Sequence, residues 1–257
     1  MSTDPYDRLD APALRALLAQ RDAQLAEQAA GMEEWMHAVS HDLRAPLRHI
    51  TSYGPLVREL LQESGLPAEA QQEALVFLDT MDQSARRMGR MLEGLLALSR
   101  IARAPLRREA VDLAALVEPV RASLAEAAQG RSVQWQIAPD LPTVQGDATL
   151  LRQMLTELLA NALKFTRGRE PVCIAVGWER GADGQFALTV QDNGAGFNPA
   201  QAAGLFGIFQ RLHRESEFEG VGAGLAAVRA IVQRHGGEAR ATAMPGDGCT
   251  VRVCWVG

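Results

Sequence analysis

The stretch Ser40-His41-Asp42-Leu43-Arg44-Ala45-Pro46-Leu47 places a histidine beside an aspartate, about one helical turn before a proline. The surrounding apolar pattern is helical, and a proline inside a helix removes a backbone hydrogen bond at a cost of roughly 3 kcal/mol. A histidine next to such an interruption is a candidate reactive group. Histidines beside acids are also common on protein surfaces, so the octapeptide alone leaves both interpretations open.

The residues before this stretch follow a seven-residue apolar period, marked by Leu18, Leu25, Met32 and Val39. Such a period is typical of a helix that pairs with another helix. We expect a coiled coil over residues 1–30, with an amphipathic helix packed on its own domain as the alternative. If Val39 lies on the seam, His41 points about 200° away from it and faces solvent.

A second helix with an apolar face follows the stop signal Ser64-Gly65-Leu66-Pro67. The residues of that face recur at spacings of three and four: Leu78, Met81, Ala85, Met88, Leu92, Leu95 and Ser99. Two helices with a short turn predict an antiparallel hairpin over residues 31–101, loosened locally at Gly54-Pro55. Because such a hairpin cannot bury both apolar stripes alone, we expect two copies to form a dimeric four-helix bundle.

The charged segment 102–110 predicts a linker to a second domain over residues 111–257. Apolar periods there predict helices over 111–128, 147–165 and 223–235, and strands over 132–138, 172–178, 186–190, 240–243 and 250–255. Helices on one face of a mixed, mostly antiparallel sheet form an α/β sandwich. The chain is therefore assigned to the α+β class, with the helical hairpin first and the sandwich second.

Composition argues against several classes of protein. The chain has 257 residues and a formal net charge of −5, which argues against a broad nucleic-acid surface. No window holds the roughly 20 apolar residues of a membrane span, and the polar N-terminus is unlike a secretory signal. The three cysteines lack metal-site spacing and suit a reducing compartment. We expect a cytoplasmic protein with no nucleic-acid partner and no membrane insertion.

The second domain carries a polar helix face made by Glu157, Asn161 and Lys164, which are four and three residues apart. A carboxylate, an amide oxygen and an ammonium on one face can hold a magnesium ion and the phosphates that it bridges. Magnesium keeps several of its waters, so a single asparagine suffices as a direct ligand. A solvated helix face is the alternative interpretation.

Two glycine-rich stretches follow this helix. In Asp192-Asn193-Gly194-Ala195-Gly196-Phe197 the glycines let the backbone approach a flat ligand, and the carboxylate can accept a hydrogen bond from the adenine amine; a plain surface turn is the alternative. Gly220-Val221-Gly222-Ala223-Gly224-Leu225 opens a helix, whose free N–H groups can bind phosphate oxygens. Between them, Phe206 and Phe209 anchor a segment that could close over a nucleotide.

In this order, behind a helical hairpin, these stretches resemble the motifs of the sensor histidine kinases of two-component systems. The matches are His41 with its neighbours to the H-box, Asn161 and Lys164 to the N-box, Asp192 to Gly196 and Gly222 with Gly224 to the two glycine boxes, and Phe206 to Phe209 to the F-box. The H-box and Gln210-Arg211-Leu212-His213 resemble the phytochrome-associated type. The resemblance runs from about residue 30 to the end and implies a Bergerat ATP-binding fold for the second domain.

The resemblance implies that the chain uses ATP and Mg²⁺ to phosphorylate itself on His41. It implies that Asp42 orients the imidazole, that Glu157 polarises the attacking ring or a metal-bound water, and that Asn161 is the metal ligand. Lys164 is expected to neutralise phosphate charge. The remaining nucleotide-contacting residues that it implies are Phe165, Asp192, Gly194, Gly196, Phe206, Phe209, Gly222, Gly224 and Thr250.

The expected partners are a second copy of the chain, the receiver domain of a response regulator that takes the phosphoryl group on an aspartate, and a separate sensor protein. The family normally has a sensory domain where this chain has only the coiled coil, so the chain could also be part of a longer kinase. Ala45 stands where the family often has a threonine or asparagine that helps hydrolyse the partner's phosphoaspartate, which predicts weak phosphatase activity.

Two other functions stay open at this point. A non-catalytic phosphotransfer or scaffold protein of the same architecture would have a degenerate ATP site, which the intact Asn161, Lys164 and Asp192 argue against. An ATP-driven clamp of the gyrase type would share the second domain but would leave His41 and the hairpin unexplained.

Overall fold

The computed structural model describes the backbone of residues 11–63, 65–181, 185–214 and 216–256, and the side chains in these ranges other than 14, 22–38 and 256. Two of the predicted seam residues, Leu25 and Met32, therefore lie outside the described side chains. The chain divides into two compact units, Met1–Gly89 and Arg90–Gly257. Among the described residues, no helix has the length and apolar character needed to cross a membrane.

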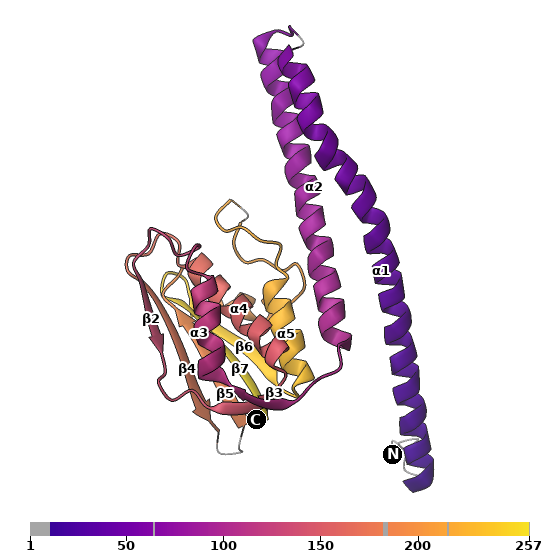
Figure 1. The fold of residues 1–257 in the computed structure, drawn as a ribbon, viewed down its shortest axis with the longest axis vertical. Coiled ribbons are helices and arrows are strands. Elements are labelled where there is room, and N and C mark those ends of the chain that lie inside the picture. The colour runs from indigo at the N-terminus through magenta and orange to yellow at the C-terminus, as the bar shows by residue number, and fades with distance from the viewer. Residues whose placement is uncertain (1–10, 64, 182–184, 215, 257) are drawn as a thin grey trace. The chain divides into compact units, whose positions relative to one another are not determined.

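The first unit consists of α1 (Ala11–Glu63) and most of α2 (Ala68–Arg103), which form the predicted antiparallel hairpin (Figure 1). The helix α1 continues through both Pro46 and Pro55, so the loosening expected at Gly54-Pro55 is not observed. Beyond Pro55, the side-chain amide of Gln71 on α2 donates to the carbonyl of Leu61 on α1 at 2.8 Å. Tertiary packing routinely outweighs the local cost of a missing N–H.

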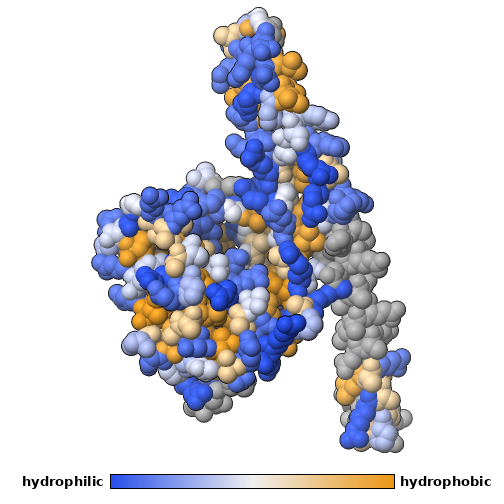
Figure 2. All heavy atoms as spheres, viewed as in Figure 1, coloured by the Kyte–Doolittle hydropathy of each residue, from blue (hydrophilic) through white to orange (hydrophobic). Residues whose placement is uncertain are grey.

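Apolar residues of the hairpin fall into a covered stripe and an uncovered one. Ala85 is 2% exposed and Leu78 is partly buried, whereas Met81 and Met88 are exposed. The predicted apolar face is therefore only partly covered within one chain, as expected for a hairpin that cannot bury both of its stripes alone. Spacings of three and four also fit an apolar face wide enough for two neighbours. The exposed apolar residues of α1 include Leu43, Ile50, Tyr53, Leu56, Val57 and Leu60. Figure 2 shows apolar residues at the hairpin surface near its turn.

The second unit contains a five-stranded sheet in the order β2-β4-β5-β7-β6. Its strands are β2 (Val133–Ile137), β4 (Val172–Arg180), β5 (Gln185–Asp192), β6 (Glu238–Met244) and β7 (Gly248–Val256). The pair β2–β4 is parallel and the other neighbours are antiparallel, as predicted. A separate ribbon pairs β1 (Glu109–Asp112) with β3 (Thr143–Gly146).

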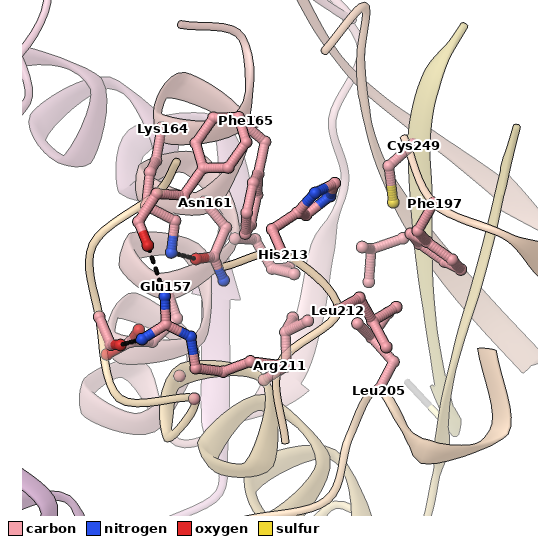
Figure 3. Close-up of a pocket in the computed structure, with 18 of the residues that line it drawn as sticks. Glu157, Asn161, Lys164, Phe165, Phe197, Leu205, Arg211, Leu212, His213 and Cys249 are labelled. Atoms are coloured by element: carbon pink, nitrogen blue, oxygen red, sulfur yellow. Dashed lines mark hydrogen bonds between the residues drawn. The ribbon is translucent and has the colours of Figure 1, made fainter. Parts of the chain in front are cut away.

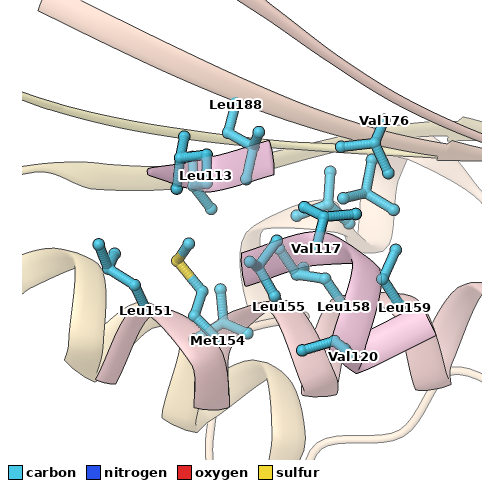
Figure 4. Close-up of a cluster of buried hydrophobic side chains, with 14 of the residues drawn as sticks. Leu113, Val117, Val120, Leu151, Met154, Leu155, Leu158, Leu159, Val176 and Leu188 are labelled. Atoms are coloured by element: carbon cyan, nitrogen blue, oxygen red, sulfur yellow. The ribbon is translucent and has the colours of Figure 1, made fainter. Parts of the chain in front are cut away.

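Three helices pack on one face of this sheet: α3 (Leu113–Ser123), α4 (Ala148–Phe165) and α5 (Gly224–Arg234) (Figure 1). A short 3₁₀ helix, η1 (Pro199–Gly204), precedes α5. Figure 4 shows side chains of α3 and α4, among them Val117 and Leu155, meeting Val176 and Leu188 of the sheet. Each fully buried aliphatic side chain contributes roughly 1.5–3 kcal/mol. This core fixes α4, and with it the polar face predicted to be functional.

The predicted linker 102–110 is shorter than expected. The helix α2 ends at Arg103, and β1 begins at Glu109. The helix α2 extends past the predicted boundary because Ile101, 3% exposed, packs in the core of the second unit. The carbonyl of Ile101 also accepts a hydrogen bond from Arg234 Nη1 at 2.6 Å. The last turns of α2 are therefore part of the second unit. The predicted helix 111–128 also splits, since its first two residues belong to β1 and α3 ends at Ser123.

Candidate functional site

His41 lies on α1 with its side chain 73% exposed, which confirms the predicted orientation toward solvent. Its Nδ1 lies 3.2 Å from Asp42 Oδ1, and the Asp42 side chain is 82% exposed. A carboxylate at Nδ1 favours the tautomer with the proton on that nitrogen, which leaves the lone pair on Nε2. The geometry therefore presents an imidazole whose Nε2 can act as a nucleophile.

The helix α4 brings Glu157, Asn161 and Lys164 together, as predicted. The helix begins where Asp147 accepts hydrogen bonds from the N–H groups of Thr149 and Leu150, at 3.0 and 3.1 Å. At its other end Lys164 Nζ donates to Asn161 Oδ1 at 3.0 Å. The polar face is therefore an ordered, half-buried surface rather than a fully solvated one.

Burial sets the electrostatics of this face. It raises the pKa of Glu157, against the opposing effect of the nearby Lys164 ammonium. Burial also lowers the pKa of Lys164, an effect that Arg211 reinforces and Glu219 opposes. The ionised carboxylate of Glu157 and the ammonium of Lys164 are therefore both partly desolvated. A ligand that supplies opposite charge, such as a polyphosphate with its metal ion, would restore part of that solvation.

Asp192 ends β5 in a buried position, 8% exposed. Its Oδ1 accepts a hydrogen bond from Gly194 N–H at 2.8 Å, yet burial still raises the pKa of Asp192 to about 6. The following glycines fit closely, because a Cβ on Gly194 would lie 2.5 Å from the Phe165 carbonyl oxygen and a Cβ on Gly196 would lie 2.0 Å from the Met244 carbonyl oxygen. The loop is therefore rigid, and its carboxylate is held ready for a hydrogen-bond donor.

The second glycine-rich stretch places the N-terminus of α5 against the polar face of α4. A Cβ on Gly224 would lie 2.4 Å from Glu157 Oε2 and 3.6 Å from Asn161 Nδ2. Gly222 has a φ of +76°, and its Cβ would lie 2.5 Å from the Gln210 carbonyl oxygen. Only glycine permits both approaches. The N-terminus of α5 therefore lies beside Asn161 and its neighbours, and the N–H groups in the first turn of a helix can bind anions.

These elements enclose a cavity of about 340 Å³. In Figure 3 the polar side chains of α4 lie on one side of it and Cys249 and Phe197 on the other, with His213 between them. Asp192 lines the cavity between apolar side chains that include Val190 and Val251. One end is thus apolar with a single buried carboxylate, and the other is polar. The predicted residues that line the cavity are Glu157, Asn161, Lys164, Phe165, Asp192, Gly196, Gly222 and Gly224.

Four of the predicted nucleotide-contacting residues do not line the cavity. Gly194 lies behind Asp192, whose Oδ1 it binds. Phe206 is 8% exposed and belongs to the core, and Phe209 has a φ of +59° and donates its N–H to the Gly222 carbonyl. Both shape the cavity from outside. Thr250 was expected to contact the ligand, but side chains alternate along β7, so its neighbours Cys249 and Val251 face the cavity instead.

The sequence interpretation assigned no role to three cavity residues. Arg211 donates from Nη2 to the Phe218 carbonyl at 2.6 Å and from Nη1 to the Gly220 carbonyl. His213 Nε2 lies 2.8 Å from the Gly196 carbonyl oxygen. Cys249 sits beside Asp192, and burial raises the pKa of its thiol to about 12, which keeps it protonated. The sequence feature that could have identified Arg211 and His213 is their position in the segment between the two glycine-rich stretches.

Comparison with known families gives two matches. Residues 32–104 match the His Kinase A (phospho-acceptor) domain, and residues 146–256 match the Histidine kinase-, DNA gyrase B-, and HSP90-like ATPase family. The first match covers the hairpin with His41, and the second covers the sheet, α4, α5 and the cavity.

Similar curated proteins are named as kinases, phytochromes or sensory proteins. The methanogenesis regulatory histidine kinase FilI of Methanothrix harundinacea is 30% identical over 90% of this chain and 25% of its own length. Cyanobacterial phytochrome A of Nostoc sp. is 30% identical over 91% of this chain and 29% of its own. The adaptive-response sensory kinase SasA of Synechococcus sp. is 32% identical, with 90% and 61% covered. The chain thus spans about a quarter to a third of the first relatives that it matches.

Solved structures with a similar fold support the same comparison. Full-length ShkA, solved in complex with AMPPNP, aligns with a TM-score of 0.60 and 26% identity over 87% of this chain and 45% of its own. The Acinetobacter baumannii histidine kinase AdeS aligns with a TM-score of 0.54 and 20% identity over 84% of this chain and 96% of its own, which supports the fold.

Proposed function

Because the chain belongs to the sensor histidine kinases of two-component systems, we propose that it phosphorylates itself from ATP on His41 and passes the phosphoryl group to an aspartate of a response-regulator receiver domain. The observation that carries this proposal is the two-ended cavity. A buried carboxylate, Asp192, lies at its apolar end, and the ammonium of Lys164 lies at its polar end. That polarity matches a flat base joined to a polyphosphate.

The base is assigned to the end at Asp192. Ionised at neutral pH, the carboxylate can accept a hydrogen bond from the exocyclic amine of adenine, whereas guanine would present a carbonyl oxygen there. Apolar side chains such as Val190 and Val251 supply the flat walls. The ATP analogue in the ShkA structure supports a nucleotide in this fold.

The phosphates are assigned to the end at Lys164, Arg211 and the N-terminus of α5. Two cations and a set of free N–H groups can neutralise and orient a triphosphate, which is the main requirement of phosphoryl transfer. Arg211 also holds the backbone at Phe218 and Gly220, so its charge is fixed in position. Ordered charge of this kind stabilises the transition state without reorganisation.

A magnesium ion fits beside Asn161. Its Oδ1 is ordered by Lys164 Nζ at 3.0 Å, and the Glu157 carboxylate lies on the same helix face. An amide oxygen with a nearby carboxylate suits an ion that retains waters and phosphate oxygens as its other ligands. When bound, the ion would neutralise charge on the transferring phosphates, and Glu157 would orient one of its waters.

His41 is the group that accepts the γ-phosphoryl group of ATP. Its Nε2 lone pair forms the new N–P bond while the bond from the γ-phosphorus to the bridging oxygen breaks and ADP leaves. The ring then carries a positive charge, which is relieved when the Nδ1 proton passes to Asp42 or to water. The distance of 3.2 Å between Nδ1 and Oδ1 supports this role for Asp42.

The uncovered apolar stripe of the hairpin supports a homodimer. Leu43, Ile50 and Val57 recur every seven residues on α1 and are exposed in the single chain. A second hairpin laid on this stripe completes a four-helix bundle. His41 lies two positions before Leu43, about 200° from the stripe, so it stays accessible in the dimer. We also propose a cytoplasmic location, with input from a separate sensor protein or from the rest of a longer chain.

The test is incubation of the full chain with γ-labelled ATP and Mg²⁺. The label should be acid-labile, alkali-stable and absent in His41→Gln, and it should pass to a receiver domain. His49→Gln, an exposed histidine two turns away on α1, is the matched control and should keep the label. A label that survives in His41→Gln would contradict the assignment of His41 as the acceptor. Nucleotide binding without any labelling would favour a clamp, and the absence of both binding and labelling would favour a scaffold.

A further inference from the structure

The segment between η1 and α5 crosses the cavity, and its described residues 205–214 and 216–222 are called here the covering segment. Its start is anchored in the core by the buried Phe206, and among the contacts described beyond that residue two involve polar side chains. His213 Nε2 lies 2.8 Å from the Gly196 carbonyl oxygen, and the Glu219 carboxylate accepts from Arg167 Nη2 at 2.7 Å. These two contacts tie the part of the covering segment beyond Phe206 to the rest of the unit.

The two contacts differ in strength. The Arg167–Glu219 pair is exposed, with side chains 56% and 63% accessible, and exposed ion pairs contribute little. His213 is partly buried and bonds to a carbonyl whose position is fixed, since Gly196 has a φ of +62° and no room for a Cβ. The imidazole is thus the stronger attachment.

Ring contacts add to this attachment. The His213 ring centroid lies 5.5 Å from that of Phe165 and 5.1 Å from that of Phe218, and the two phenylalanine centroids lie 5.0 Å apart. Phe165 is the last residue of α4, and its carbonyl accepts the N–H of Ala195. One imidazole therefore connects α4, the first glycine loop and both halves of the covering segment. Figure 3 shows His213 beside Phe165.

We propose that His213 is a positioning residue that holds the covering segment closed over the bound nucleotide and thereby sets the rate at which nucleotide leaves. The inference rests on the proposed binding of ATP in this cavity. It assigns His213 no chemical step. Nε2–H donates to the Gly196 carbonyl, and the ring fills the space between the two phenylalanines, so opening the cavity requires both contacts to break together.

Two substitutions separate the two contacts. His213→Phe keeps a ring between Phe165 and Phe218 but removes the donor to Gly196. His213→Gln keeps a side-chain N–H group at the reach of Nε2 but removes the ring. Matched controls are His49→Phe and His49→Gln, the same two changes at an exposed site on α1.

The measurement is stopped-flow release of a fluorescent ATP analogue from the full chain, displaced by excess ATP. His213→Phe should release it roughly 2- to 10-fold faster, the range for one lost hydrogen bond, and His213→Gln should also be faster than the parent chain. The KM for ATP in autophosphorylation should rise in both, with kcat unchanged, while both controls stay within about twofold of the parent.

Several outcomes would overturn the inference. One is that the parent chain binds the analogue and both His213 variants release it at the parent rate. Another is that the variants lower only the melting temperature of the nucleotide-free protein, which would make the ring cluster simple packing. If the parent chain itself fails to bind the analogue, the proposed function falls first, and the inference falls with it.

Discussion

Replacing Asp192 by asparagine should stabilise the second unit and abolish ATP binding. Burial raises the pKa of Asp192 from 3.8 to about 6, so the folded protein prefers the protonated form. The free energy of unfolding therefore falls as pH rises through this window, and the loss is complete at neutral pH. At about 1.4 kcal/mol per unit of pKa difference, the ionised carboxylate costs the folded state on the order of 3 kcal/mol.

Asparagine removes most of this cost. The Oδ1 of asparagine can still accept the hydrogen bond from the Gly194 N–H, which spans 2.8 Å in the parent chain. Its NH₂ group cannot accept the hydrogen bond that the Asp192 carboxylate receives from the Cys249 N–H. A net gain of about 1–2 kcal/mol is therefore expected at pH 8, after an unmade hydrogen bond is allowed for. For a unit of this size that gain raises the melting temperature by roughly 2–8 °C. At pH 4 most of the gain should vanish, because Asp192 is then protonated.

The assay is thermal unfolding of the parent chain and of Asp192→Asn between pH 4 and pH 8, paired with calorimetric titration of MgATP at pH 8. Asp247→Asn, an exposed aspartate in the β6–β7 turn, is the matched control and should change neither quantity. A variant that is less stable at pH 8, or equally stabilised at both pH values, would refute the desolvation argument. Retained ATP binding would refute the assignment of Asp192 to the adenine amine.

Three further predictions follow from named contacts. Ala45→Thr should speed dephosphorylation of a phosphorylated receiver domain, measured by loss of label; equal rates in Ala45→Thr and the similarly shaped Ala45→Val would contradict it. Gly196→Ala, at a φ of +62° with a Cβ 2.0 Å from a carbonyl oxygen, should lower the free energy of unfolding by roughly 1–3 kcal/mol and weaken ATP binding; unchanged melting and affinity would count against the rigid loop. The double change Ile50→Lys and Val57→Lys should weaken dimerisation about 100-fold or more in light scattering, while Glu59→Lys, exposed on the same helix, should not.

Local patterns predicted the parts of the site that lie on one regular element. Glu157, Asn161 and Lys164 share a face of α4 because the period of a helix places residues three and four apart side by side. The exposure of His41 followed in the same way from its angle to an apolar seam. Asp192 was identified because a strand leads directly into its loop. None of these inferences needs contacts from distant parts of the chain.

Other features depended on which distant segment each residue meets. The same spacings of three and four placed Met81 with Ala85, yet only Ala85 is covered within the chain. The resemblance implied Thr250 as a nucleotide contact, whereas in the structure its neighbours Cys249 and Val251 line the cavity. Residues 205–222 show no period, so the positions of Arg211 and His213 could not be derived before the fold was known.

The order of residues alone determined the two-part organisation, the exposure of His41 and the polar face of α4, because helical and strand periods are short-range and each motif lies within one or two turns. The tertiary structure decided which apolar stripe is covered, which side of β7 faces the cavity and how His213 joins three separate segments. Those outcomes are set by contacts between residues far apart in the chain, and their energies depend on burial and distance, which no local period encodes.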